Sequence, residues 1–543
     1  MKNIHRVIRI VVLVMIMAGC SMGVARAQIK VQAQRPQTPV LLDRKDNTLF
    51  NIRIDAPQRG IMESLTLNLD SETAKYVKSL KLYYAGSDAA DVAADKMISV
   101  DYIRDGKRVA DSSLSILKDK ARASSVVTLQ GDVNLFPGIN YFWVSVEMSA
   151  KTPLTHKVKA EIAAVKVSGQ DYEPVAVGHL CESQRVGIGV RHAGDDDVSA
   201  YRIPGLVTTS AGTLLGVYDV RYNSSRDLQG RIDIGLSRST DGGQSWERMR
   251  LPLHFGEWGG LPSAQNGVGD PAILYDPVMN RAWIIAVWCH GMGSRMAWHA
   301  TKPGMTPYTT GQLVLAYSDD DGRSWSKPIN ITEQVKLSDW NFVLQGPGRG
   351  IAMQDGTLVF PFQHHEGTNK MPSAGIIYSK DHGRTWHLHN WARENTTEAQ
   401  VVELPSGELM LNMRDNRGGS RAVSTTSDFG RTWVEHPSSR KALREPVCMA
   451  SLIAVRAEDN VSGRNILLFS NPDDEKDRKN MTIKISFDNG LTWPIENQVL
   501  LDEDSWWGYS CLTMIDDKTV GILYECSQAH MVFQAVPLSD LLK

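Results

Sequence analysis

A short motif that recurs five times between residues 239 and 493 constrains the fold more than any other feature of the chain. Its form is S/T-x-D-x-G-x-S/T-W, and successive copies are 79, 61, 47 and 60 residues apart when measured between their aspartates. In a tight turn, Asp and Ser/Thr side chains cap backbone amides, and Gly adopts a positive φ. The Trp side chain then fills a gap between neighbouring sheets. We therefore expect five structural hairpin turns, whose aspartates are Asp241, Asp320, Asp381, Asp428 and Asp488.

These turns predict an all-β fold. Each copy follows a strand-like run, such as Leu313 to Tyr317, and the intervals suit four short strands with their loops. At roughly 60 residues per unit, the part from 181 to 543 has room for six units, one of them without a recognisable copy. The chain also contains 44 Gly and 14 Trp, which favour tight turns and aromatic plugs over long helices. We predict a six-bladed β-propeller over 181–543.

The segment from 28 to 180 has a different pattern and predicts a second domain. Apolar residues alternate with polar ones at Leu65, Leu67 and Leu69, and a further strand is expected over Tyr141 to Met148. Such short alternating strands predict a β-sandwich that precedes the propeller. Glycan binding and a packing or spacer role are both open for this domain, because it contains no catalytic motif.

Residues 1–27 have the pattern of an export signal. A positive start over Lys2 to Arg9 is followed by the short apolar run Ile10 to Met17 and by Ala25-Arg26-Ala27, which predicts cleavage before Gln28. The competing pattern is Met17-Ala18-Gly19-Cys20, a lipoprotein box that would attach a lipid anchor at Cys20. We expect an exported protein, either periplasmic or secreted, or alternatively an outer-membrane lipoprotein. No later apolar stretch is long enough to predict a membrane span.

Charge and cysteine usage argue against several other classes of protein. Lys plus Arg number 59 against 61 for Asp plus Glu, so nucleic acid is not an expected partner. The motif nearest to a metal site is His364-His365-Glu366, which we interpret as a rim loop, and neither a metal nor another cofactor is expected. Without any C-x-x-C pattern, buried free thiols are favoured over one disulfide for Cys181, Cys289, Cys448, Cys511 and Cys526.

The motif Tyr201-Arg202-Ile203-Pro204-Gly205-Leu206, upstream of the five turns, resembles the bacterial exo-sialidases, or neuraminidases. The resemblance covers about two thirds of the chain. It implies a glycan substrate with a terminal sialic acid, whose anomeric carbon carries a carboxylate. Planar guanidinium groups suit that carboxylate better than the point charge of Lys. The family pattern has three such arginines, and it matches Arg202, Arg414 in Leu409 to Asp415, and Arg478 in Asp477 to Asn480.

The resemblance also implies the catalytic residues. A carboxylate nucleophile would approach a centre that already bears an anion, whereas a neutral Tyr avoids this repulsion. Tyr509 matches the family's nucleophile, Glu398 the base that takes its proton, and Asp227 the acid/base residue. Asp219, Asp233 and Asp195 to Asp197 are rivals to Asp227. Three further positions match family residues: Arg221 and Asp270 for substrate contact, and Glu525 for orienting the first arginine.

The function implied by the resemblance is retaining hydrolysis of terminal α-linked sialic acids from glycoproteins, glycolipids and oligosaccharides, through a tyrosyl intermediate. A trans-sialidase or intramolecular trans-sialidase would use the same site and differ only in how the aglycone rim excludes water. A non-catalytic propeller that binds sialic acid is the alternative from another class. The joint presence of Asp227, Glu398 and Tyr509 argues against it.

Overall fold

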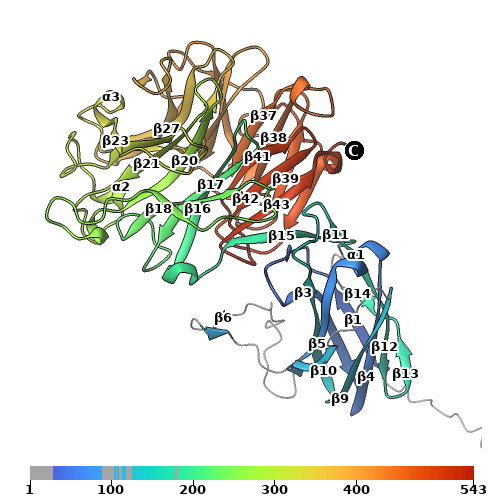
Figure 1. Cartoon of the computed structure of the whole chain (residues 1–543). Coiled ribbons are helices and arrows are strands. Elements are labelled where there is room, and N and C mark those ends of the chain that lie inside the picture. Colours follow the sequence, from blue (N-terminus) through green and yellow to red (C-terminus); the bar gives the residue numbers. More distant parts are fainter. Residues whose placement is uncertain (1–27, 88–102, 105–106, 109–112, 118–124, 178–180) are drawn as a thin grey trace, which may run out of the picture.

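The computed structural model describes residues 28–87, 103–104, 107–108, 113–117, 125–177 and 181–543, so the predicted export signal and Cys20 lie outside the described residues. Within them the chain forms two β-rich lobes, a small one from the first part of the chain and a large one from the rest (Figure 1). No helix within the described ranges has the length and apolar character needed to cross a membrane.

Among the described residues, the small lobe contains two sheets of four or more strands and one two-stranded pair. Alternation builds its core: Leu65, Leu67 and Leu69 of β4 (Gly60–Leu69) are buried, whereas the residues between them are exposed or half-buried. The short helix α1 (Ser71–Tyr76) starts where the Asp70 carboxylate accepts a hydrogen bond from Thr73 N. One sheet has the order β14 (Val175–Ala176), β1 (Lys30–Gln34), β3 (Asn47–Ala56), β10 (Gly138–Met148), β5 (Val77–Ser87), β8 (Ser113–Leu117); the other has β13 (Gln170–Tyr172), β12 (Ala160–Val167), β4 (Gly60–Leu69), β9 (Val126–Leu135); β6 (Ile103–Arg104) pairs with β7 (Lys107–Arg108).

The large lobe contains six sheets of four or more strands, which follow one another along the chain. The first three are β16 (Ala200–Thr208), β17 (Leu214–Arg221), β18 (Ile232–Ser239), β19 (Arg250–Leu253); then β23 (Ile329–Asn330), β22 (Gln312–Ser318), β21 (Arg281–Trp288), β20 (Val268–Asp276), β25 (Gly348–Arg349); then β24 (Phe342–Gln345), β27 (Leu358–Glu366), β28 (Met371–Ser379), β29 (His387–Leu388), with β26 (Ile351–Ala352) and β30 (Arg393–Glu394) at their edges.

The other three sheets complete the lobe. They are β31 (Thr396–Glu403), β32 (Leu409–Asp415), β34 (Ala422–Thr426), β35 (Val434–Glu435); then β37 (Ser451–Val455), β38 (Ile466–Pro472), β39 (Met481–Ser486), β40 (Gln498–Asp502); then β41 (Ser510–Asp516), β42 (Thr519–Tyr524), β43 (Met531–Pro537), β15 (Gln184–Arg191). A small pair, β33 (Gly419–Ser420) with β36 (Arg444–Glu445), and the helical turns α2 (Ala297–Ala300) and α3 (Thr332–Val335) lie in the connections.

Contacts between consecutive sheets run through their leading strands. β16 contacts β20, β20 contacts β24, β27 contacts β31, β31 contacts β37, and β37 contacts β41. β41 of the last sheet also contacts β16 of the first. The last sheet takes its strand β15 from the residues that precede the first sheet, so the two ends of the lobe are joined by backbone pairing.

The five repeated motifs form the turns that the sequence predicts. In the third copy, Ser379 Oγ accepts from Gly383 N at 2.8 Å, and Asp381 accepts from both the backbone N (2.9 Å) and the hydroxyl (2.6 Å) of Thr385. Gly383 has a φ of 85°, and the other four copies repeat these contacts with a positive-φ Gly. At Gly243 of the first copy a Cβ would overlap the ring of Phe533 in the last sheet, so the turn requires Gly.

Candidate active site

A cavity of about 640 Å³ gathers seven of the nine site residues that the sequence predicts. Four of the seven lie on strands of three sheets, and the other three lie on connecting loops. Arg221 and Glu525 are not part of the wall and lie behind it, in contact with lining residues. The seven lining residues are Arg202, Asp227, Asp270, Glu398, Arg414, Arg478 and Tyr509.

Irregular backbone aims several of these side chains into the cavity. The register of β16 shifts between Arg202 and Gly205, and that of β20 shifts between Gly269 and Ala272. The register of β31 shifts in the same way next to Glu398. Ile203 and Asp270 lie in these irregular stretches with φ of 61° and 58°, which is unusual for residues other than Gly. Bulges bend a strand and redirect its side chains, so the leading strands leave regular pairing where they supply the site.

Tyr509 and Glu398 form a direct pair although 111 residues separate them in the sequence. The Tyr509 hydroxyl donates to Glu398, at 2.6 Å from Oε1 and 2.7 Å from Oε2. Arg414 Nη1 donates to Glu398 Oε2 at 2.6 Å and lies 3.1 Å from the Tyr509 hydroxyl. A carboxylate this close can take the phenolic proton, and the guanidinium stabilises the negative charge on either oxygen.

Burial raises the pKa of Tyr509 well above its ordinary value, and the negative charge of Glu398 raises it further. The phenol is therefore neutral at physiological pH in the free protein. It can act as a nucleophile only if its proton leaves as the new bond forms, and Glu398 is the group placed to receive that proton.

Glu525 connects Arg202 to Tyr509. Its carboxylate accepts from Arg202 Nε at 2.8 Å, from Ile203 N at 3.0 Å and from Tyr509 N at 2.9 Å. The Trp507 ring lies against the Arg202 guanidinium, at 4.8 Å between Cζ and the ring centroid. The buried carboxylate of Glu525 thus holds one edge of the Arg202 guanidinium, and the indole of Trp507 covers one of its faces. These two contacts fix the orientation of the remaining N–H donors of Arg202.

Arg478 reaches the cavity from the charged segment before β39. Its guanidinium donates to the carbonyls of Trp507 (3.1 Å) and Val447 (3.0 Å). These two bonds fix the side chain beside the Tyr509 ring, at 5.8 Å from the ring centroid. Although its neighbours Glu475 to Asp477 are exposed, Arg478 itself is half-buried.

Asp227 lies on the loop after β17 and is held by Arg221. Arg221 Nη1 donates to Asp227 Oδ1 at 2.6 Å, while Nε and Nη2 donate to Asp219 Oδ2 at 3.0 and 2.8 Å. The Asp227 side chain is 35% exposed, whereas that of Arg221 is 1% exposed. A carboxyl group that lines the cavity and still contacts solvent is suited to exchange protons with a substrate and then with water.

Two of the rival carboxylates have partners of their own. Asp195 accepts from His192 N, and Asp233 accepts from the Tyr222 hydroxyl. Asp219 is a residue whose place the sequence analysis did not identify: it lies beneath the site and holds Arg221. The signal for it is the i, i+2 spacing, which puts Asp219 and Arg221 on the same face of β17.

Asp270 is half-buried beside Asp219. Its backbone N donates to Asp219 Oδ1 at 2.8 Å, and its carbonyl accepts from the Gln345 side chain. Burial raises the pKa of the Asp270 carboxyl well above its ordinary value, and the nearby charge of Asp219 adds to the effect. Burial also raises the pKa of Asp219 to about 6, against the opposing charge of Arg221. A raised pKa favours the protonated form of Asp270, which donates as well as accepts hydrogen bonds.

The interpretation of His364-His365-Glu366 as a rim loop is wrong. All three residues belong to β27, because the pairing of β27 with β28 continues through them to Glu366. His364 is buried and stacks on Trp340 with ring centroids 3.9 Å apart, and His365 lines the cavity.

In the part of the chain that the structure covers, no cluster of three or more His, Cys, Asp or Glu could hold a metal ion. The prediction of buried free thiols is confirmed for the five described cysteines.

Much of the remaining cavity wall has no sequence motif. Phe342, Leu344 and Gln363 come from β24 and β27, whose side chains meet only through strand pairing. Loops after β21 and β27 add the other members of this part of the wall, which include Arg295, Trp298, His299, Thr368, Asn369 and Lys370.

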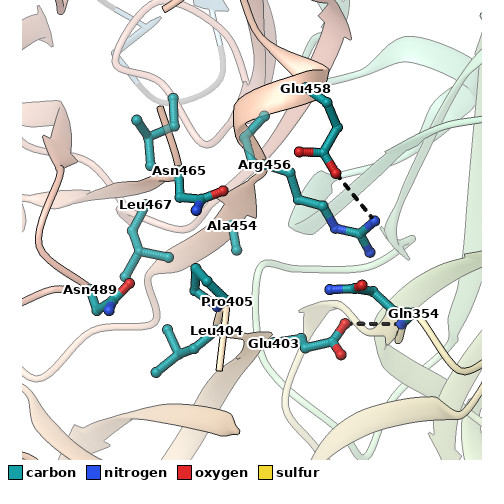
Figure 2. Close-up of a pocket in the computed structure, with 12 residues that line it drawn as sticks. Gln354, Glu403, Leu404, Pro405, Ala454, Arg456, Glu458, Asn465, Leu467 and Asn489 are labelled. Atoms are coloured by element: carbon teal, nitrogen blue, oxygen red, sulfur yellow. Dashed lines mark hydrogen bonds and ion pairs between the residues drawn. The ribbon is translucent and has the colours of Figure 1, made fainter. Parts of the chain in front are cut away.

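A smaller cavity of about 200 Å³ lies at the far end of β31 and includes Glu403 (Figure 2). There Glu403 accepts from the backbone N of Gln354 at 3.0 Å, and Arg456 pairs with Glu458 at 3.9 Å. Glu398 and Glu403 therefore occupy opposite ends of one strand, and the charged groups of this second cavity are paired with their own surroundings.

Comparison with known proteins agrees with these features. Residues 26–171 match the model for the N-terminal domain of BNR-repeat neuraminidase, and residues 203–525 match the model for the BNR repeat-like domain. The chain is 56% identical over 531 residues to a sialidase of Bacteroides fragilis, covering 96% of this chain and 97% of the relative. It is 32% identical to a sialidase of Clostridium perfringens, over 60% of this chain and 86% of that one.

Similarity to solved structures agrees with these sequence matches. The Hadza microbial sialidase Hz136 superposes with a TM-score of 0.89 at 54% identity, covering 94% of this chain and all of the other. The intramolecular trans-sialidase of Ruminococcus gnavus shares the fold at 21% identity, with a TM-score of 0.55 over 65% of this chain and 97% of the other. The repeats, the paired domain matches and the similarity over nearly the whole length lead to one conclusion: the chain belongs to the bacterial BNR-repeat sialidase, or neuraminidase, family.

Proposed function

We propose that the protein is a retaining exo-sialidase that hydrolyses terminal α-linked sialic acids through a covalent bond to Tyr509. The observation that carries the proposal is the contact of the Tyr509 hydroxyl with both oxygens of Glu398, in a cavity that also presents Asp227 and three arginines. The name shared by the most similar relatives supports the same activity. Its substrates are sialylated glycoproteins, glycolipids and oligosaccharides.

In the first step, Arg202, Arg414 and Arg478 bind the substrate carboxylate. The bond between the anomeric carbon and the aglycone oxygen breaks, and Asp227 gives its proton to that oxygen. The Tyr509 oxygen bonds to the anomeric carbon and its proton passes to Glu398. In the second step, Asp227 takes a proton from water, the water oxygen displaces Tyr509, and Glu398 returns the proton to the phenolate. Two inversions give retention.

The other predicted residues support this chemistry. Arg221 holds Asp227, Glu525 orients Arg202 and the Tyr509 backbone, and Asp270 contacts the hydroxyl and N-acyl groups of the sugar. All of these steps use side chains of the chain itself, so the proposed reaction calls on no cofactor.

For the architecture, we propose a six-bladed β-propeller over 181–543, preceded by a β-sandwich over 28–180. Six consecutive sheets, contacts between their leading strands, and the pairing of β15 with β43 support the propeller. The two-sheet arrangement of the small lobe supports the sandwich.

For localisation, we propose export by the signal in 1–27 to the periplasm or the medium, with a lipid anchor at Cys20 as the alternative.

Replacing Tyr509 with Phe tests the proposal. The change removes one oxygen and keeps the ring, so folding and substrate binding should survive while kcat falls by at least about a hundredfold. A sialoside fluorinated next to the anomeric carbon should leave a sugar-sized mass on the wild-type peptide that contains Tyr509, and none on the variant.

Tyr524→Phe is the matched control, because Tyr524 of β42 is also buried and its hydroxyl donates a hydrogen bond to Gln534 Oε1 at 3.1 Å. It should keep wild-type turnover. A label on Glu398 or Asp227, or an inverted first product in NMR, would contradict the proposed roles.

A further inference from the structure

The rim of the active-site cavity carries positive charges that the proposed reaction does not use. Arg295 and Lys370 line the cavity, and Lys302 lies on the same loop as Arg295. We call these three residues the basic rim. The segment 277–318, which supplies two of them, contains no Asp or Glu.

No carboxylate balances this charge within the described ranges. Arg295 and Lys302 are exposed, and their side chains form no hydrogen bond or ion pair there. The Lys370 ammonium donates to the carbonyls of His299 at 2.8 Å and Thr301 at 2.6 Å, which leaves one of its three donors unused. Burial has the largest effect on the pKa of Lys370 and lowers it. The positive charges of Arg295 and Lys302 lower this pKa further, as expected for cations that lie close together.

The loop that bears these charges is tied to the catalytic machinery. Arg226, the neighbour of Asp227, donates to the carbonyl of Ser294 at 2.6 Å. Lys370, near the tip between β27 and β28, holds the other end of the same loop through two carbonyls. The loop backbone is therefore held at the cavity before any ligand arrives, and an anion would relieve the repulsion between the cations that the loop carries.

One sialic acid carries one carboxylate, which Arg202, Arg414 and Arg478 already account for. We propose that the basic rim binds a second anionic group of the substrate, either the carboxylate of an adjoining sialic acid or a sulfate ester. This inference rests on the proposed function, because it extends the same cavity. Oxyanions of both kinds accept hydrogen bonds from Arg and Lys, so both share the chemistry that the rim offers.

The expected effect is modest and sensitive to salt. Exposed ion pairs are weak, so each rim cation should change kcat/KM for a dianionic substrate by about two- to fivefold at low ionic strength. The preference should decline as salt rises to about 0.5 M, since the charges are exposed and screened.

The test compares matched substrates that differ in one charge. One pair is α2,8-disialyllactose with its inner carboxylate free or converted to an amide. The other is a 3'-sialyl-N-acetyllactosamine with or without a sulfate on its N-acetylglucosamine. Wild type should hydrolyse the dianionic member of at least one pair faster than its singly charged partner, and the pair that responds identifies the group.

The variant Arg295→Gln should reduce that preference, and Arg295→Gln combined with Lys302→Gln should nearly abolish it. Arg384→Gln is the matched control: Arg384 is an exposed arginine in the third repeat turn, at the opposite end of its sheet. It should keep the full preference. Equal rates within both pairs at low salt, or a preference that persists in the double variant, would overturn the inference.

Failure of the proposed function is recognised separately in the same experiment. If the singly charged members of both pairs are not hydrolysed by wild type, the proposed activity itself is wrong. If they are hydrolysed without any charge preference, only the basic rim is wrong.

Discussion

At the residue scale, the resemblance to the sialidases assigned the three arginines and the Tyr–Glu pair, because each occurs in a local motif that matches the family. The structure places all five at one cavity, where burial raises the pKa of Tyr509. The relation between Arg221 and Asp219 could not be predicted, because an i, i+2 pair on a strand looks like any solvated pair until the strand is buried. Both side chains have at most 1% of their surface exposed.

Replacing Arg414 tests the electrostatic part of this picture. Arg414→Ala removes the donor to Glu398 Oε2, so we expect kcat/KM to fall by at least about tenfold, because a charge-assisted hydrogen bond contributes about 1.5–3 kcal/mol. Arg414→Lys should recover only part of the activity, since a point charge cannot replace the planar group.

Steady-state kinetics with a sialyllactose measures the effect. Arg444→Ala is a suitable control, because Arg444 pairs with Asp473 at 2.8 Å outside the residues that line the cavity. Arg414→Ala with the kinetics of the control would show that Arg414 does not bind the substrate.

At the scale of single elements, the repeat motif predicted the turns because their contacts are local. Ser379, Asp381, Gly383 and Thr385 lie within seven residues and satisfy one another. The bulges in β16, β20 and β31 are different, because a bulge becomes visible only when the partner strand is in register. For the same reason, β27 was mistaken for a loop at its His-rich end.

The turns should give the protein a dependence on pH that is separate from catalysis. Burial alone would raise the pKa of Asp381, but the hydroxyl and backbone N–H of Thr385 lower it to about 2. Because the folded-state pKa is below the unfolded one, this stabilisation is complete above about pH 4 and is lost as the pH falls towards 2.

Asp381→Ala should therefore lower the free energy of unfolding by about 1 kcal/mol at pH 7, similar to the loss of a helix N-cap. The difference from wild type should be nearly unchanged when urea unfolding is repeated at pH 4, and it should shrink at pH 3. A difference that stays constant over this range would mean that the ionised carboxylate is not what stabilises the turn.

At the scale of the whole molecule, the two lobes share more than a covalent linker. β2 (Val40–Leu41) and β11 (Lys157–Val158) of the N-terminal region both pair with β15, which in turn pairs with β43 of the last sheet. Asp540 near the C-terminus accepts from Arg185 at 2.5 Å and from Lys157 at 2.9 Å. Period-two alternation could predict the strands of each lobe, but it says nothing about which lobe a short edge strand joins.

This arrangement predicts that the lobes unfold together. One apolar cluster contains Leu49 and Val146 of the small lobe together with Val186, Leu523 and Phe533 of the large one. Separating the lobes would expose this surface and leave β15 without two of its partners, and buried apolar area contributes roughly 25 cal/mol per Å².

Scanning calorimetry of residues 28–543 should thus show one transition. Deleting residues 28–180 should lower the unfolding temperature and cause self-association in size-exclusion chromatography, because an uncovered strand edge and apolar patch invite pairing with another copy. Lys166→Ala, which breaks a partly exposed ion pair with Glu63 on the small lobe, is the control and should change neither. A monomeric deletion variant that melts at the wild-type temperature would show instead that the small lobe is an independent appendage.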